Sequence, residues 1–436
     1  MADEKNWIRE AMFYHIYPLG FTGAPLRNEG EATAGGRILE VLDWIEHFKE
    51  LGINAIYFGP IFESVSHGYD TTDYYQTDSR LGSKEDFKKV FTALHENGIR
   101  VIVDGVFNHV GRKFFAFLDV QKNLEQSDYK DWFCNLNFSW QSPLGDSFSY
   151  ENWHGAAELV KLNLRNPAVC EHLLGAVGMW MDELGIDGLR LDAADCVDRE
   201  FFKRLHSFTK GKREDFWLMG EIIHGDYRVW ANDEMLDSVT NYECWKGIYS
   251  SHNDKNYFEI AYSLKRQFGQ GGLYENLCLY NFLDNHDVNR IGSLLKQREN
   301  LKNAYTLLYM MPGIPSIYYG SEWGIEGVKG QGMDADLPLR PKLDLEEMCA
   351  QETDLPAHIR ELAKIRKESD AVKYGAYDEV LVRNKQFVFA RRSGEQYKVI
   401  ALNLTDHAET LHFSYQGKEY EVLLEAYTCL LYTSDA

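Results

Sequence analysis

Eight short apolar runs, separated largely by stretches of helical periodicity, are the feature that most restricts the fold of this sequence. Each run is short enough for one strand of a parallel sheet, whose strands are apolar on both faces when the sheet is buried. Helical patterns at 37–52, 83–98 and 166–185 supply crossovers between such strands. The runs are AMFYHIYPL (11–19), INAIYFGP (53–60), RVIVDGVFN (100–108), IDGLRLD (186–192), FWLMGEI (216–222), LDSVTNY (236–242), LCLYNFLDN (277–285) and IPSIYYG (314–320).

Eight strands with intervening helices predict an α/β chain with a (β/α)8 barrel, and a doubly wound open sheet is the structural alternative. Two stretches depart from the pattern. Between His109 and about Lys161 the chain is aromatic and polar, and is too long for an ordinary loop. After about residue 372, short alternating runs predict an antiparallel β-sandwich. We therefore divide the chain into barrel (1–109), inserted domain (110–162), barrel (163–371) and C-terminal all-β domain (372–436).

Polar side chains gather where four of the predicted strands end. In a (β/α)8 barrel the catalytic groups come from the C-terminal ends of several strands, which meet around one cavity. A single aspartate in such a place is commonly a cap or an ion-pair partner, but four polar strand ends together indicate an active site. The strand ends are DGVFNH (104–109), GLRLD (188–192), GEIIH (220–224) and FLDNHD (282–287).

The carboxyl groups of this set suit retaining glycoside hydrolysis. That reaction needs two carboxyl groups, one to attack the anomeric carbon and one to protonate the leaving oxygen and then activate water. A further anion nearby would stabilise the oxocarbenium-like transition state. Arg190, two residues before Asp192, would hold a nucleophile at Asp192 ionised and oriented, while Glu221 must start protonated.

The four strand ends, in this order, resemble those of the alpha-amylase superfamily, family 13 of the glycoside hydrolases. Three further segments resemble the same family: IYFGPIFESVSHGYDTTDYYQTD (56–78), KLNLRNP (161–167) and GIPSIYYGSEWG (313–324). Within the superfamily, HGYDTTDYY, SDYKDWF, VKLN, LRLDAADCVD, GEIIH and TNYE are most similar to the cyclomaltodextrinase, neopullulanase and maltogenic amylase group. The resemblance spans nearly the whole chain.

The resemblance implies a role for each matching residue. Asp192 is the nucleophile, Glu221 the general acid/base, and Asp287 the third carboxylate, which grips sugar hydroxyls. Arg190 orients Asp192, and Asp104 is a structural partner of Arg190. The other substrate-binding residues that it implies are His109 and His286 at the cleavage subsite, Tyr69 stacked on the sugar ring, and, with weaker matches, Asn163, His224, Asp284 and Arg340.

Several features differ from the group. The chain begins almost at the first predicted strand, without the group's usual N-terminal β-domain, so the resemblance fixes neither an oligomeric state nor a preference for small cyclic substrates. Asp195-Cys196 stands where the group has Asn-Glu and where calcium-binding amylases have Lys-His. Asn108 matches a calcium ligand of those amylases, but a cysteine is a poor ligand for calcium. The reaction needs no cofactor, and the sequence does not support a calcium site. The unusual loop at 327–341 is expected to shape the entrance or a leaving-group subsite.

Composition excludes several other partners. The net charge is −21 without a basic block, so neither nucleic acid nor an anionic membrane is expected as a partner. The chain has no run of eighteen apolar residues and no recognisable signal peptide at its start. Its seven cysteines are scattered and never form a CxxC pair, which fits a reducing cytoplasm. The tail CLLYTSDA (429–436) resembles a translated sequencing adapter, with an ordinary final strand as the alternative.

We therefore expect a hydrolase of α-1,4-linked glucans and maltodextrins, with possible action on α-1,6 bonds. A glucosyl transferase or isomerase of the same superfamily shares the covalent intermediate and is the first alternative. A non-catalytic binding relative is the second, but such relatives lose catalytic carboxylates, and here all three are present.

Overall fold

Eight parallel strands form the central sheet of the protein in a computed structural model that describes residues 7–30, 36–332 and 334–433. Their order is β11-β10-β9-β5-β2-β1-β13-β12. A β-bridge between Thr240 and Tyr280 joins the two ends of this order, so the sheet closes into a barrel, and the alternative of an open sheet is wrong. The strands are β1 (Phe13–Ile16), β2 (Ala55–Phe58), β5 (Arg100–Gly105), β9 (Gly188–Leu191), β10 (Trp217–Gly220), β11 (Ser238–Val239), β12 (Tyr280–Phe282) and β13 (Ile314–Tyr318).

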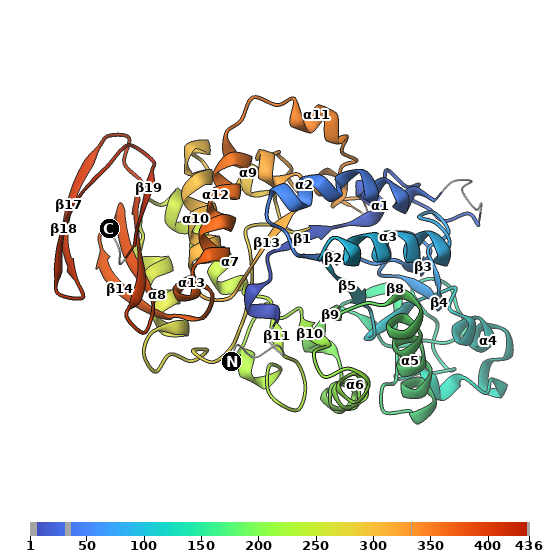
Figure 1. The fold of residues 1–436 in the computed structure, drawn as a ribbon. Coiled ribbons are helices and arrows are strands. Elements are labelled where there is room, and N and C mark those ends of the chain that lie inside the picture. The colour runs from blue at the N-terminus through green and yellow to red at the C-terminus, as the bar shows by residue number, and fades with distance from the viewer. Residues whose placement is uncertain (1–6, 31–35, 333, 434–436) are drawn as a thin grey trace.

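Helices cover the outside of the barrel (Figure 1). The stretch at 37–52 is a 3-10 helix over Arg37–Trp44 followed by α2, rather than the single helix that its periodicity predicts. The stretch at 166–185 is α5, continued by a π-helical turn over Trp180–Leu184. The larger helices around the barrel are α2 (Ile45–Glu50), α3 (Lys84–Glu96), α5 (Pro167–Met179), α6 (Arg199–Lys212), α7 (Tyr242–Asn253), α8 (Phe258–Phe268), α10 (Leu301–Met310) and α12 (Leu355–Glu368).

Local sequence explains where two of these helices begin. Ser83 forms a capping box with Asp86 at the start of α3, and the Asn166 side chain accepts a hydrogen bond from the Ala168 amide at the start of α5. The glycines inside α5 allow close packing: a Cβ at Gly175 would lie 2.6 Å from the hydroxyl of Tyr75. Tertiary contact therefore offsets the low helix propensity of glycine here.

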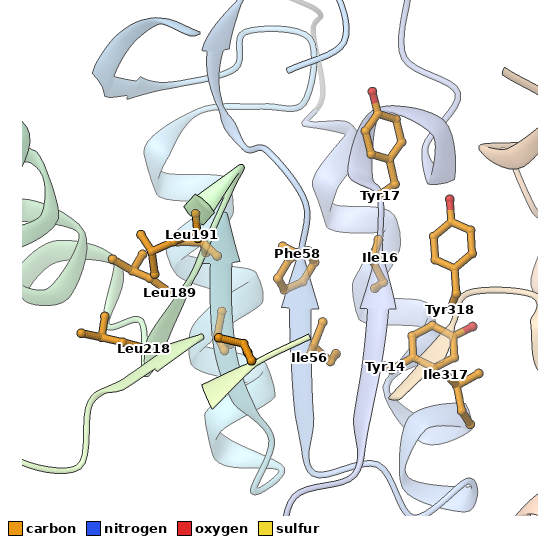
Figure 2. Close-up of a cluster of buried hydrophobic side chains, with 14 of the residues drawn as sticks. Tyr14, Ile16, Tyr17, Ile56, Phe58, Leu189, Leu191, Leu218, Ile317 and Tyr318 are labelled. Carbon is orange, nitrogen blue, oxygen red and sulfur yellow. The ribbon is translucent and has the colours of Figure 1, made fainter. Parts of the chain in front are cut away.

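Side chains of the barrel strands alternate between two buried clusters, as the two faces of a strand require. One face packs against the helices, and Leu189 and Leu191 lie there in the cluster that Figure 2 shows. The other face fills the barrel interior, where Phe13, Tyr57 and Trp217 pack together. Arg190 alternates with the two leucines and so points into the barrel, as predicted.

The connection between β5 and β9 carries a small sheet of its own, in the order β6-β8-β7. An antiparallel pair, β3 with β4, follows β2 and was not expected from the sequence. The boundaries drawn at 109/110 and 162/163 stay predictions. The elements of these two regions are β3 (Phe62–Ser64), β4 (Thr71–Thr77), β6 (His109–Gly111), α4 (Phe115–Asn123), β7 (Asn152–Trp153) and β8 (Ala156–Lys161).

Two antiparallel sheets follow the barrel, as predicted, and a separate apolar cluster lies between them. In the tail at 429–436, residues 429–433 form a strand, β19, which pairs with β16. Residues 434–436 lie outside the described part of the chain. None of the helices in that described part is long and apolar enough to cross a membrane. The elements are α13 (Asp370–Tyr374), β14 (Ala376–Val382), β15 (Gln386–Ser393), β16 (Gln396–Asn403), β17 (Glu409–Tyr415), β18 (Lys418–Leu424) and β19 (Cys429–Thr433).

Candidate active site

A cavity of about 1320 Å³ lies at the C-terminal ends of the barrel strands. Its walls come from the segments that follow β1, β9, β10, β12 and β13 and from the inserted sheet. Arg190 and His286 lie directly behind the wall, in contact with residues that form it. The predicted site residues that line the cavity are Tyr69, His109, Asp192, Glu221, Asp287 and Arg340.

One guanidinium group holds the carboxylates of three neighbouring strands. Nη1 of Arg190 lies 3.0 Å from Oδ1 of Asp104 and 2.9 Å from Oδ1 of Asp192, and Nη2 lies 2.8 Å from Oε2 of Glu221. The Ala193 amide donates to the same Oε2 of Glu221 at 3.1 Å. Arg190 is 3% exposed and Asp104 is 1% exposed, so these charge-assisted bonds are formed out of water and are strong.

Strand register brings these groups together. Arg190 pairs across the sheet with Asp104 on β5 and with Met219 on β10, and Glu221 follows β10 directly. After Asp192 the chain leaves the strand through Ala193, whose φ is +43°, a left-handed conformation that is uncommon for a residue other than glycine. This turn directs the Ala193 amide at Glu221.

Tyr69 is held in place by two hydrogen-bonding partners. Its hydroxyl donates to Oδ2 of Asp104 at 3.0 Å and contacts Nε2 of His286. Its ring stacks on the His286 ring, with centroids 5.4 Å apart and planes inclined by 10°. Tyr69 therefore presents a fixed aromatic wall to the cavity, which suits the apolar face of a sugar ring.

Asp287 lies between two potential cations. Nε2 of His286 is 3.1 Å from its Oδ2, and Nη2 of Arg340 is 3.0 Å from its Oδ1. Burial acts to raise the pKa of Asp287, but His286 and Arg340 outweigh it and leave this pKa well below its usual range. His286 and Arg340 therefore favour the ionised form of Asp287.

The pKa of Asp192 is shifted in the opposite direction. Burial raises its pKa well above the usual range, the charges of Glu221 and Asp104 act in the same direction, and Arg190 opposes them. Arg190 thus acts in the direction expected of it, since it lowers the pKa of Asp192 against burial and the two other carboxylates. One guanidinium cannot neutralise three enclosed carboxylates, so the pKa of Asp192 stays above that of an isolated aspartate.

His109 is a neutral group at the cavity wall. Burial lowers its pKa to about 3. Its Nδ1 lies 3.1 Å from Nδ2 of Asn108, and its Nε2 lies 3.9 Å from Oδ2 of Asp192 without a hydrogen-bond partner among the described residues. A buried ring nitrogen without a partner beside a cavity is suited to bind a hydroxyl group of a ligand.

Three of the weaker sequence matches do not reach the cavity. The Asn163 side chain donates to the carbonyl of Asp131, and the Asp284 carboxylate accepts from the Ile291 amide and the Ser321 hydroxyl. Both side chains thus hold loops rather than ligand. His224 is exposed and lies outside the cavity lining. The structure places these three side chains away from the cavity lining, and their contact with substrate stays a prediction.

Other lining residues received no role from the sequence. Tyr17, just after β1, lies against the guanidinium of Arg340, whose Cζ is 4.5 Å from its ring centre. The Tyr242 hydroxyl lies 3.4 Å from Oε1 of Glu221. The signal that could have identified them is their position just beyond a barrel strand, since Tyr17 follows β1 directly and Tyr242 lies three residues after β11. The loop at 327–341 also lines the cavity, in agreement with its expected place at the entrance.

Asn108 and Cys196 are the positions at which the sequence raises the question of calcium, an ion that takes oxygen ligands. Across 7–30, 36–332 and 334–433, no group of three or more His, Cys, Asp or Glu side chains could hold a metal ion. Asn108 faces His109, and Cys196 contacts the imidazole of His154 through sulfur, which is a soft donor and a poor calcium ligand.

The family model and the relatives that match this chain belong to the same family. Residues 15–361 match the family model described as alpha amylase, catalytic domain. A cyclomaltodextrinase of a Bacillus species is 31% identical over 428 residues, which are 93% of this chain and 74% of the relative. An intracellular maltogenic amylase of Bacillus subtilis is 31% identical over 386 residues, which are 84% of this chain and 63% of the relative.

A solved structure with a similar fold is the cyclic alpha-maltosyl-(1→6)-maltose hydrolase of Arthrobacter globiformis in its ligand-free form. It superposes with a TM-score of 0.85 at 26% sequence identity, over 98% of this chain and 99% of the other.

Proposed function

The chain belongs to the alpha-amylase family of glycoside hydrolases, and from this premise we propose that it cleaves α-glucans through a covalent glycosyl–Asp192 intermediate. The contact of Arg190 with both Asp192 and Glu221 supports this mechanism most directly. Two carboxyls bonded to adjacent nitrogens of one guanidinium stand side by side, as retention requires, whereas inversion needs room between them for a water molecule.

In the proposed first step, Asp192 attacks the anomeric carbon while Glu221 protonates the departing glycosidic oxygen. In the second step, Glu221 removes a proton from water, which attacks the anomeric carbon and releases Asp192. The reactive form of the pair has its single proton on Glu221.

We assign the remaining wall residues to the sugar bound at the point of cleavage. Asp287 stays ionised and accepts hydrogen bonds from sugar hydroxyls, and its negative charge stabilises the oxocarbenium-like transition state. Tyr69 provides the ring platform, and His109 and His286 bind hydroxyl groups. Arg340 fixes Asp287 and the loop that carries it.

The protein is an α-glucan hydrolase, and we propose short linear and cyclic maltodextrins as its substrates. The name of the Bacillus cyclomaltodextrinase supports action on cyclic α-glucans, and that of the Arthrobacter hydrolase supports tolerance of α-1,6 bonds. The name of the intracellular Bacillus subtilis relative supports a cytoplasmic enzyme. Chromatography of the products from maltotriose, a cyclodextrin and pullulan tests this assignment, and lengthened or isomerised sugars as main products would contradict it.

Two variants test the assigned roles. Asp192→Ala should lower turnover of maltotriose and of α-maltosyl fluoride at least about a thousandfold, because neither substrate can react without the nucleophile. Glu221→Gln should lose far more activity on maltotriose than in the first turnover of α-maltosyl fluoride, since fluoride departs without protonation. Azide should then trap the intermediate of this variant as α-maltosyl azide. Near-normal turnover of maltotriose by either folded variant would refute the mechanism.

A further inference from the structure

The side chain of Asn285 lies behind the cavity wall and contacts several residues that form it. Asn285 comes three residues after β12, is 9% exposed, and does not line the cavity. Its Oδ1 accepts from the backbone amides of Asp287 at 2.9 Å and Val288 at 3.1 Å, and both of these residues do line the cavity. Because two backbone donors identify Oδ1 as the oxygen, the atom that faces Tyr242 is the Nδ2 donor.

The hydroxyl of Tyr242 links this amide to Glu221. Nδ2 of Asn285 donates to the Tyr242 oxygen at 3.0 Å, and the Tyr242 hydroxyl donates to Oε1 of Glu221 at 3.4 Å. The Tyr242 ring is buried and is held edge-on by Phe282 and Trp245, with ring centres 4.9 and 5.6 Å away. Burial and the charge of Glu221 raise the pKa of Tyr242 well above its usual range, so this group stays a hydroxyl that can donate.

The two carboxyl oxygens of Glu221 face different donors. Oε2 lies 2.8 Å from Nη2 of Arg190 and accepts from the Ala193 amide at 3.1 Å. An oxygen that already accepts from a guanidinium and an amide is a poor site for a proton, so the proton of the acid form lies on Oε1.

Oε1 is therefore the oxygen that protonates the leaving group. In that step the O–H bond at Oε1 breaks, the proton passes to the glycosidic oxygen, and the bond from that oxygen to the anomeric carbon breaks. Negative charge develops on Oε1 as its proton leaves. Among the described residues, Tyr242 lies beside this oxygen as a donor.

We propose that Asn285 is a positioning residue for the general acid, because it directs the Tyr242 hydroxyl to Oε1 of Glu221, where this donor stabilises the charge that develops during proton transfer. A donor that is oriented in advance needs no reorganisation when the charge appears, and the hydrogen bond from Nδ2 polarises the hydroxyl further. The inference rests on the proposed function, since it takes Glu221 as the general acid. It also explains why an amide outside the cavity lining joins the turn of Asp287 to the first residue of α7.

The variant Asn285→Ser separates this role from that of the turn. A serine hydroxyl can still accept from the Asp287 amide, but it is one bond shorter and leaves the Tyr242 oxygen without its donor. With maltotriose, kcat should fall about threefold and KM should change less than about twofold, because Asn285 does not line the cavity. The first turnover of α-maltosyl fluoride should keep its rate within about twofold, since fluoride departs without a proton from Glu221.

Combination with Tyr242→Phe tests whether Asn285 acts through the hydroxyl. If it does, adding Asn285→Ser to Tyr242→Phe should cause no further loss of kcat for maltotriose, so the two losses are not additive. Asn232→Ser is the matched control, because Oδ1 of Asn232 accepts from the Glu234 amide in a similar turn that does not line the cavity. This control should change neither the kcat for maltotriose nor the first turnover of the fluoride.

Three results would each overturn the positioning role of Asn285: an unaltered kcat for maltotriose, an equal loss in the first turnover of the fluoride, or a further threefold loss in the double variant. Chemical denaturation shows whether each variant is folded. If Asn285→Ser does not fold, Asn285→Thr supplies the same hydroxyl and takes its place. A wild-type protein that turned over neither substrate would instead contradict the proposed function, and this inference with it.

Discussion

Replacing Asp104 by asparagine tests how the buried charges set the chemistry. Asp104 does not line the cavity, and every group that faces it is a donor. Its Oδ2 accepts from the hydroxyls of Tyr57 at 2.7 Å and Tyr69 at 3.0 Å, and both of its oxygens face Nη1 of Arg190. Asparagine keeps the shape but turns one acceptor into a donor. In Asp104→Asn, an NH₂ group would therefore face a donor without water to relieve it.

The cost to stability follows from these contacts. Hydrogen bonds to charged groups contribute about 1.5–3 kcal/mol each, and an unsatisfied buried donor costs about 1–3 kcal/mol. Because the amide oxygen still accepts from the tyrosine hydroxyls, we expect Asp104→Asn to lower the free energy of unfolding by about 2–4 kcal/mol. Chemical denaturation measures this loss, and a variant as stable as the wild type would contradict the hydrogen-bond geometry.

The same change should move the acid side of the pH–rate profile. Oxygens of Asp104 and Asp192 bond to the same nitrogen of Arg190, so they are at most about 6 Å apart. Two like unit charges at that distance and an effective dielectric constant of about 20 repel each other by about 3 kcal/mol, and by more if they are closer. The Asp104 charge raises the pKa of Asp192, so removing it lowers that pKa. Since the nucleophile must be ionised, activity should persist to a lower pH than in the wild type.

The assay is kcat/KM for α-maltosyl fluoride as a function of pH, because fluoride needs no general acid and the acid limb then reports the nucleophile. Asp78→Asn is a matched control: Asp78 forms a buried pair with Arg80 at 2.7 Å and does not line the cavity. The control should lose stability without moving the acid limb. An acid limb of Asp104→Asn that stays in place, or that moves to higher pH, would refute the reasoning.

Three further changes test other parts of the structure. Tyr242→Phe removes the hydroxyl near Glu221 and should lower kcat for maltotriose about fivefold; an unaltered kcat would contradict a contact with the general acid. Ser83→Ala removes the cap of α3 and should lower the free energy of unfolding by about 1 kcal/mol without changing kcat. A change in kcat would argue against a purely local role of this cap. Hydrogen bonds from His95 and from the Val101 amide outweigh burial and lower the pKa of Asp187, so its stabilisation is complete above the unfolded pKa of about 3.9 and is lost as pH falls through the lower folded value. Asp187→Asn should therefore unfold more easily than wild type at neutral pH but equally in strong acid, and a gap that widened on acidification would contradict this sign.

The barrel strands were predictable because buried parallel strands leave a strong apolar pattern. All eight predicted runs contain a strand of the barrel, although each strand is shorter than its run. The hairpin of β3 and β4 was not predicted, because its strands are short and only partly buried and so carry little hydrophobic pattern. The 3-10 turn over Arg37–Trp44 was missed since it keeps the apolar residues on one face, as an α-helix does.

The site was predictable to the extent that strand ends determine it. Asp192, Glu221 and Asp287 follow their strands closely, and all three line the cavity. Asp284 also follows a strand, but its carboxylate binds the Ile291 amide and so holds a loop. Sequence alone does not distinguish these two uses of a carboxylate, because loop amides that compete for it are fixed only by the fold.

The arrangement around Arg190 separates what the barrel fixes from what the loops can vary. Its partners come from β5 and from the ends of β9 and β10, so the register of three hydrogen-bonded strands sets the spacing of nucleophile and acid. A shift of one of these strands would leave a buried charge without its partner, at a cost of several kcal/mol. The segment with Asp195 and Cys196 lies beyond this register, and Sγ of Cys196 lies 3.5 Å from Nε2 of His154 in the β7–β8 hairpin. The loops around the cavity can therefore vary without moving the groups that break the bond.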